Sequence, residues 1–437
     1  SQSVSVHSIN IADTVSNKMV EFHADVEAVS LITTINGYNL QFNEDVTLSE
    51  DVIFQAIGDL TLGDATDDVL LFAGGVDARL VAGVVQLSGA VITSGQQVHF
   101  GAITLAADTI LDTTNNAAYV TGADVTLGAI MAAGNDLSIK AGSASSVVFS
   151  GSVIMSDNDL TIESANTVKI NAAMEANSGS VAICADKSYV DAAIEITSAG
   201  SVQMVAADIG VAAGISTEGG SIEFDGAVTN VANANVLLTT GDGLGDIAFG
   251  ATLTAVDTSN ANNITLVAGA GNVNFSGAVT LNDNDLTLVS VNQVDINESI
   301  TSTAGDVYIA ASGMISGGAD LVVGNGGVIS IASSNGAGVV LGDITVAQSN
   351  GVDHVFGDAD TGDMVFGQLE QLGSEGVGDF GDVKIYKGGA ADAIMIQASG
   401  GSIYDITVAS QRESYVAEDV DVESIAVEGD YWVIDFV

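Results

Sequence analysis

Short alternating segments, each following a glycine-containing corner, recur along this chain about every 21 residues, a period typical of stacked repeats. Each has a small pair such as Gly-Ser, Gly-Asp or Gly-Asn, followed by apolar, any residue, apolar; examples are SGSVAI, AGSVQM, GGSIEF, AGNVNF and AGDVYI. Alternation with a period of two is typical of short β-strands that bury one face. Gly, Ser, Asp and Asn favour tight corners, because glycine accepts positive φ and the other three hydrogen-bond to nearby backbone.

The spacing of these segments predicts a solenoid. Their first apolar positions are nearly evenly spaced, apart from one double step between Ile222 and Ile264 that is taken as two coils; they are Leu160, Val181, Val202, Ile222, Ile264, Leu286, Val307 and Ile329. Even spacing of this kind indicates stacked structural units. Further segments inside each coil give two or three strands per coil. We therefore predict an all-β, parallel β-helix with coils of about 21 residues.

One stretch of the repeat occurs twice with nearly the same sequence. MSDNDLTIESANTVKINA at 155–172 and LNDNDLTLVSVNQVDINE at 281–298 keep the same apolar order without a gap. In a parallel solenoid each strand stacks on its counterpart at about 4.8 Å. We predict that both Asp-Asn-Asp stretches form the same corner and that Cys184 points away from the core. The side chains predicted to be buried are Val181, Ile183, Val202, Met204, Leu286, Val307 and Ile309.

The composition suits a chain of hydrogen-bonded strands and excludes some partners. Proline, which removes a ladder donor, is absent from the 437 residues. The chain has 8 Lys and Arg against 56 Asp and Glu, a formal net charge of −48. A field of this sign repels nucleic acid and anionic lipid. No run of about 18 apolar residues would span a membrane as a helix.

Both ends depart from the repeat, so we predict three regions. They are an N-terminal cap or docking segment at 1–30, the solenoid at 31–385, and a C-terminal cap or assembly segment at 386–437. Solenoids need atypical terminal units, because a bare end coil exposes an unpaired strand edge.

The two ends also supply candidate assembly residues. The final stretch DYWVIDFV has two largely apolar faces, and SVSVHSINIAD near the start is an alternating strand. We predict that a terminal strand adds to the sheet edge of a second copy and gives a head-to-tail homopolymer. The alternative is that the last segment caps its own coil. The residues assigned to assembly are Tyr431, Trp432, Ile434, Phe436, Val4 and Val6.

The repeats also resemble a known class. AGNVNFSGAVTLNDNDLTLVS and NSGSVAICA are similar to the repeats of filamentous haemagglutinin-like adhesins and other large secreted β-strand-repeat proteins. The resemblance covers about residues 98–346. It implies secretion, a right-handed parallel β-helix, and adhesion or filament building at a cell surface, with a host surface, a neighbouring cell or a glycan as partner. The first residues, SQSVSV, lack a methionine, as expected of a processed product.

A carbohydrate-binding or polysaccharide-cleaving β-helix is the alternative class. β-Helical lyases use Arg or Lys as the base beside a carboxylate-bound Ca²⁺. Here Lys169 corresponds to Asp295 in the second copy, so no basic groove builds up. The four histidines lack metal-ligand spacing, and no Ser-His-Asp constellation with a nucleophile elbow is visible. We therefore predict that the chain is not an enzyme.

Calcium is the predicted cofactor. GDADTGDM, LGDATDDV and GDGLGD place carboxylates close together in the sequence, partly like a calcium loop but without its closing Glu. Solvated turn carboxylates are the alternative. The candidate ligands are Asp358, Asp360, Asp363, Asp64, Asp67, Asp68, Asp242 and Asp246.

Overall fold

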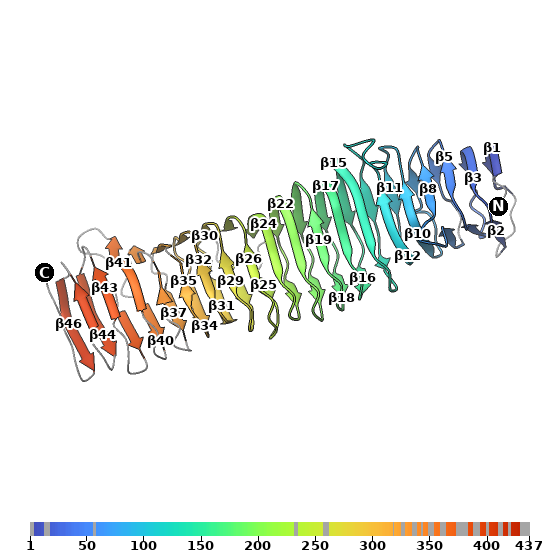
Figure 1. The fold of residues 1–437 in the computed structure, drawn as a ribbon. Helices are drawn as coiled ribbons and strands as arrows, with labels where there is room; N and C mark the ends of the chain where they lie inside the picture. Colours follow the sequence, from blue (N-terminus) through green and yellow to red (C-terminus); the bar gives the residue numbers. More distant parts are fainter. Residues whose placement is uncertain are drawn as a thin grey trace. The chain divides into compact units, whose positions relative to one another are not determined.

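The computed structural model describes a chain of short strands and corners that falls into two units, Ser1–Ile209 and Gly210–Val437 (Figure 1). It describes residues 4–428 apart from 13–17, 56–57, 231–234, 257–261, 318, 325–327, 334–338, 342–343, 348–353, 359–363, 373–382, 388–393, 399–401, 410–413 and 418–420. From residue 342 onward only the strand backbone is described. In these described parts no helix is long and apolar enough to cross a membrane.

Three parallel ladders of strands make up the first unit. The first contains β1 (Val4–Asn10), β3 (Val26–Ile32), β5 (Val46–Leu48), β8 (Val69–Phe72), β10 (Val85–Ile92), β12 (Ile103–Asp112), β15 (Leu137–Phe149), β17 (Leu160–Ile170), β19 (Val181–Cys184) and β22 (Val202–Val211). The second contains β2 (Met19–Phe22), β4 (Asn39–Phe42), β7 (Leu60–Leu62), the first halves of β10 and β12, β14 (Ile130–Met131), β16 (Val153–Ser156), β18 (Met174–Ala176) and β21 (Ile194–Ile196). The third contains β6 (Val52–Ile53), β9 (Val76–Asp77), β11 (Val98–Phe100), β13 (Val125–Leu127), the second halves of β15 and β17, and β20 (Lys187–Val190).

The second unit has the same plan. Its first ladder contains β23 (Ile215–Thr217), β25 (Val236–Thr239), β28 (Ile264–Val267), β31 (Leu286–Val291), β34 (Val307–Ala311), β37 (Ile329–Ser333), β40 (His354–Asp358), β42 (Val383–Lys387), β44 (Ser402–Ala409) and β46 (Asp421–Glu428). Its second contains β24 (Ile222–Asn230), β26 (Ile247–Phe249), β29 (Val273–Phe275), β32 (Val294–Ile296), β35 (Ile315–Ser316), β38 (Val339–Val340), β41 (Met364–Leu372), β43 (Ile394–Ala398) and β45 (Ser414–Ala417). Its third contains the second half of β24, β27 (Leu253–Ala255), β30 (Val279–Asn282), β33 (Ile300–Ser302), β36 (Leu321–Gly324) and β39 (Ile344–Ala347).

Each unit is thus a parallel β-solenoid, and the predicted fold class is confirmed at that level. The right-handed coiling implied by the resemblance stays a prediction. So does the division at residues 30 and 385, although the parallel pairing includes β1 and continues through β46.

Apolar side chains fill the interior as ladders. All seven side chains predicted to be buried are at most 2% exposed, and Cys184 is exposed, as predicted. Aromatic rings also stack from coil to coil: the ring centroids of Phe224, Phe249 and Phe275 are separated by 5.4 and 5.3 Å. Because each ring covers the next, these ladders exclude water along the core.

One step of the predicted spacing is wrong. Ile222 pairs with Ile247, which pairs with Val273, so the strands of this ladder lie further apart in the sequence than the predicted period. Ile264 pairs with Leu286 in a different ladder. The double step from Ile222 to Ile264 therefore does not represent two coils of one ladder.

Longer connections contribute to this error, and one of them is the corner between β25 and β26. After β25, the buried Thr240 donates its hydroxyl to the carbonyl oxygen of Gly245 at 2.8 Å, which closes an outward turn over 241–246. The extra residues leave the core unchanged, so apolar spacing does not reveal them.

The two Asp-Asn-Asp stretches form corners with the same local geometry. Each begins with a non-glycine residue in the left-handed region, Ser156 with φ of 56° and Asn282 with φ of 52°. In each, the central Asn donates its backbone N–H to the carbonyl oxygen three residues earlier, at 3.2 Å for Asn158 and 3.0 Å for Asn284. The repeated sequence therefore encodes a repeated local conformation. The prediction that both stretches form the same corner of the coil is wrong, because the first stretch leads from the second ladder (β16) to the first (β17), whereas the second leads from the third ladder (β30) to the first (β31) of its unit.

Glycines that stack on these two corners in the following coil are required for close approach rather than for positive φ. A Cβ atom on Gly179 would lie 1.8 Å from the carbonyl oxygen of Asn158. One on Gly305 would lie 1.9 Å from that of Asn284. The coils pack so closely here that only glycine fits.

Candidate functional site

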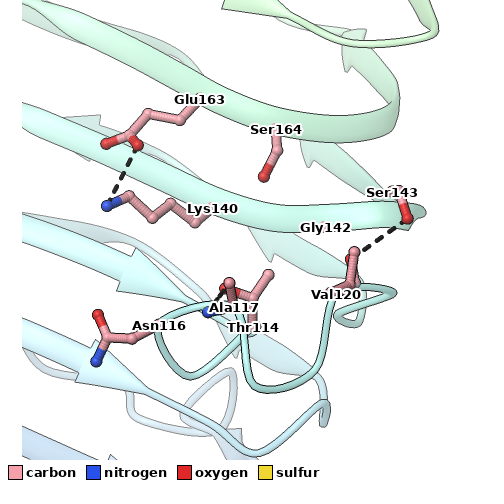
Figure 2. Close-up of a pocket in the computed structure, with 9 residues that line it drawn as sticks. All are labelled: Thr114, Asn116, Ala117, Val120, Lys140, Gly142, Ser143, Glu163 and Ser164. Atoms are coloured by element: carbon pink, nitrogen blue, oxygen red, sulfur yellow. Dashed lines mark hydrogen bonds and ion pairs between the residues drawn. The ribbon is translucent and has the colours of Figure 1, made fainter.

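A recess of about 480 Å³ interrupts the regular outer surface of the first unit (Figure 2). Two neighbouring strands, β15 and β17, form one side, and the loop at 113–124 forms the other. Its lining combines charged, polar and small apolar groups: Thr114, Asn116, Ala117, Val120, Lys140, Gly142, Ser143, Glu163 and Ser164.

Buried side chains fix the start and end of this loop. Asp112, only 1% exposed, accepts hydrogen bonds from the backbone N–H groups of Thr114 at 2.6 Å and Asn116 at 2.8 Å. The fully buried hydroxyl of Thr113 accepts the N–H of Ala123 at 2.9 Å and donates to the carbonyl of Ala141 at 2.8 Å. A buried carboxylate held by backbone donors makes this loop a defined structure.

Three successive residues of the loop have positive φ. The angles are 49° at Asn115, 54° at Asn116 and 68° at Ala117. Asn tolerates this region, whereas a residue with a plain Cβ adopts it at an energetic cost. Such conformations persist where the surrounding structure imposes them, and they cluster at ligand-binding sites.

An irregularity in β15 makes room for the loop. The pairing of β15 with β17 changes register on both sides of Gly142, whose φ is 94°. The loop then lies against this bulge, because Ser143 donates its N–H to the carbonyl of Val120 at 3.0 Å. Bulges redirect side chains and are frequent beside functional sites.

Lys140 and Glu163 project from the two strands toward the same side of the recess (Figure 2). The Lys140 Nζ atom lies 3.2 Å from Glu163 Oε2, with 32% and 45% of the two side chains exposed. Ser138 donates its hydroxyl to Glu163 Oε1 at 2.8 Å. The recess therefore presents an ammonium donor and a carboxylate acceptor, each held in position and each reached by solvent.

A second, smaller recess of about 300 Å³ contains Asp77, Arg79 and His99. The Arg79 guanidinium binds Asp77 through two contacts, of 3.0 and 2.6 Å. This hydrogen bonding holds the pKa of Asp77 below its usual value. Both contacts use guanidinium N–H groups of Arg79, so this side chain is less available to bind a ligand than the Lys140 ammonium group.

Acidic side chains at the corners accept hydrogen bonds from backbone N–H groups of the next coil. Asp108 Oδ1 accepts the backbone N–H of Asp136 at 3.0 Å, Asp136 accepts that of Asp159 at 3.0 Å, and Asp159 accepts that of Ser180 at 2.8 Å. In the second unit, Asp285 and Asp306 continue the same pattern at 2.8 Å each. We call these rows the corner ladders. They explain why Asp, Asn or Ser precedes so many strands.

Two of the predicted calcium ligands in the described residues, Asp68 and Asp246, accept backbone hydrogen bonds. Asp68, 6% exposed, accepts the N–H groups of Asp64 at 2.7 Å and Ala65 at 2.9 Å. Asp246 accepts the N–H of Asn272 at 2.7 Å. Asp67 and Asp242 are exposed. Where the structure describes the chain, no three His, Cys, Asp or Glu side chains gather to hold a metal ion, and calcium binding stays a prediction.

The other predicted site residues lie largely outside the described residues. Asp358 ends β40, and its side chain is not among those described; Asp360 and Asp363 fall in the gap that follows. Val4 and Val6 lie on β1, with Val6 43% exposed. The four C-terminal assembly candidates, Tyr431, Trp432, Ile434 and Phe436, also lie beyond the described part.

Sequence reasoning missed the recess. Its residues belong to different coils and share no motif. The length of one coil was nevertheless a signal. Val98 pairs with Val125 and Leu111 with Ile139, and the sequence separation within each pair exceeds the predicted period of about 21 residues. A coil longer than its neighbours, with TTNNAAYVT in place of a Gly-Asp-Val corner, indicates an insertion loop.

Comparison with protein-family models, with curated proteins and with solved structures gave no match to this chain. The parallel β-solenoid agrees with the resemblance to β-helical surface proteins at the level of architecture alone.

Proposed function

We propose that this chain is an extracellular structural and adhesive β-solenoid, a subunit of a surface filament or surface layer. The observation that carries the proposal is the continuity of the parallel ladders. Nearly every strand uses both backbone edges to pair with the coils before and after it, as Leu286 does with Ile264 and Val307. In a chain built this way, most of the sequence forms stacked coils, and these present a long, repeated outer surface.

The assembly part of the proposal uses the directionality of parallel ladders. β1 pairs with β3 along one edge, and among the described residues no strand pairs with its other edge. In a second copy, a strand joining that edge would continue the ladder in the same direction. Such a contact joins two different surfaces of the chain. It gives a filament when the rotation between successive copies does not close into a ring.

Electron microscopy and sedimentation of the full-length chain test assembly. We expect head-to-tail polymers, and we expect deletion of residues 430–437 or the substitution Val6→Asp to leave shorter ones with an unchanged circular-dichroism spectrum. Monomers at every concentration would contradict strand addition. Unfolding of the deletion variant would mean that the C-terminal segment caps its own coil. Surface labelling of intact source cells tests the location.

One observation favours the alternative of a carbohydrate-binding solenoid. The recess beside Lys140 and Glu163 is an irregular, anchored feature of the outer surface. Binding of a glycan there is compatible with adhesion, so the two functions combine in one molecule.

A further inference from the structure

We propose that the recess between the loop 113–124 and strands β15 and β17 binds a neutral saccharide. This inference names the ligand class for the adhesive part of the proposed function and rests on it. It concerns a specific site made by Asn116, Lys140 and Glu163, which line one cavity from three different coils.

The size of the recess fits a small ligand. Its volume of about 480 Å³ lies within the usual range for ligand pockets, roughly 300–1,000 Å³. The opening is wide, so a ligand that belongs to a longer chain can enter without threading. Both properties suit one or a few units of an exposed glycan.

The hydrogen-bonding groups select a polyhydroxylated ligand. A carboxylate only accepts and an ammonium only donates, whereas the Asn116 amide does both. A sugar hydroxyl also donates and accepts, so one hydroxyl can donate to Glu163 while it accepts from Lys140. Ser164 adds a hydroxyl group to the lining, and the Ser143 hydroxyl, which donates to the Val120 carbonyl at 3.3 Å, adds an acceptor.

Other ligand classes fit less well. An anion would meet the field of a chain with a net charge of −48. A cation would have to displace Lys140 from Glu163. An apolar ligand would strip water from that ion pair without replacing its hydrogen bonds. A neutral saccharide avoids all three costs. The apolar C–H faces of its rings can pack against Ala117 and Val120 in the lining.

The anchored loop reduces the entropic cost of binding. Asp112 and Thr113 hold the loop from beneath, and these internal hydrogen bonds fix its conformation, including the positive φ angles at 115–117. Ligand binding therefore does not need to order this segment. Preorganisation of this kind increases affinity.

The test begins with a glycan array of neutral and anionic saccharides, probed with the full-length chain. The best neutral saccharide is then titrated against Glu163→Gln and Lys140→Met. The matched controls are Asp208→Asn and Lys187→Met, because Lys187 and Asp208 form an exposed pair at 3.9 Å on the regular wall. Circular dichroism confirms that each variant is folded.

We expect at least a tenfold loss of affinity in the two recess variants and less than a twofold change in the two controls. Equal losses in both pairs, binding of anionic saccharides alone, or no saccharide binding would overturn the proposal. Electron microscopy of the same samples separates the two proposals. Wild-type polymers that bind no saccharide would leave the structural function standing and refute the site.

Discussion

At the residue scale, a single carboxylate often connects two coils. Asp285 Oδ1 accepts the backbone N–H of Asp306 at 2.8 Å, and its Oδ2 accepts the side-chain amide of Asn263 at 3.0 Å. Asn263 in turn accepts the N–H of Asp285 at 2.9 Å. The position therefore needs an acceptor oxygen toward Asp306, which either Asp or Asn supplies, whereas the second acceptor toward Asn263 requires the carboxylate.

This requirement predicts different outcomes for two substitutions. Asp285→Ala leaves the Asp306 N–H without its acceptor and is expected to lower the free energy of unfolding by about 1–2 kcal/mol. Asp285→Asn keeps the acceptor for the Asp306 N–H but places an NH2 group opposite the Asn263 amide, so we expect a smaller loss, below about 1 kcal/mol. Urea unfolding followed by circular dichroism measures both. Equal destabilisation would show that the charge, and not the hydrogen bond, matters at this corner.

The hydrogen bonds of the Asp157 carboxylate predict that the stability of the fold depends on pH. Hydrogen bonds from Asn177 and Ser178 lower its pKa below the usual 3.8. A folded-state pKa below the unfolded value means that the carboxylate contributes stability above pH 3.8, and that this contribution disappears as the pH falls through the folded value. The difference in melting temperature between wild type and Asp157→Ala should therefore be largest at neutral pH and shrink below pH 3.8. A difference that grows in acid would contradict this assignment.

At the element scale, short strands leave little room for error, because each contributes only a few inward side chains; on β31 these are Leu286, Leu288 and Val291. Leu286 is fully buried, whereas the adjacent Thr287 faces outward and is half-buried. Leu286→Asp puts a charge among the apolar ladders and is expected to cost more than about 3 kcal/mol. Thr287→Asp should cost less than about 1 kcal/mol, since its side chain reaches water. Thermal and urea unfolding compare the two; similar losses would refute the register of this ladder.

Glycine at the corners gives a second prediction at this scale. Gly179→Ala forces a Cβ against the carbonyl oxygen of Asn158, and we expect a loss of about 1–3 kcal/mol. Gly101 serves as the control, because the nearest atom to its Cβ position lies 3.7 Å away and its φ is not in the left-handed region. Gly101→Ala should be neutral or stabilising by up to about 1 kcal/mol. If alanine is tolerated equally at both positions, the coils are not as close as the structure shows.

The elements also show which features the sequence could predict. Alternation at 181–183 and 307–309 identified strands and their buried faces, since burial demands apolar residues with a period of two. It did not identify the ladder to which Ile264 belongs, because residues added between strands, such as the turn at 241–246, change no core residue. The longer coil at 113–124 indicated an insertion loop, but the side chains that share the recess were not predictable. Lys140 and Glu163 lie in successive coils, and their meeting depends on the register shift in β15.

At the scale of the whole molecule, the dominant quantity is a formal net charge of −48. Parallel stacking places carboxylates of successive coils close together, as in the corner ladder through Asp108, Asp136 and Asp159. Hydrogen bonds to backbone N–H groups offset part of the repulsion, and the remainder opposes folding. Cations in solution reduce it further by screening.

This charge predicts that salt stabilises the chain and that calcium adds a separate effect. We expect the melting temperature to rise between about 0.02 and about 0.5 M NaCl, because this change shortens the Debye length from about 20 to about 4 Å. At one fixed ionic strength, calcium should raise it further if carboxylates such as Asp64, Asp67 and Asp242 bind the ion, and a chelator should reverse that increase. Asp67→Asn and Asp242→Asn should then reduce the calcium increment while leaving the NaCl increment nearly unchanged. Coincident melts with calcium and with chelator would rule out specific sites, and screening alone would then account for the stabilisation by salt.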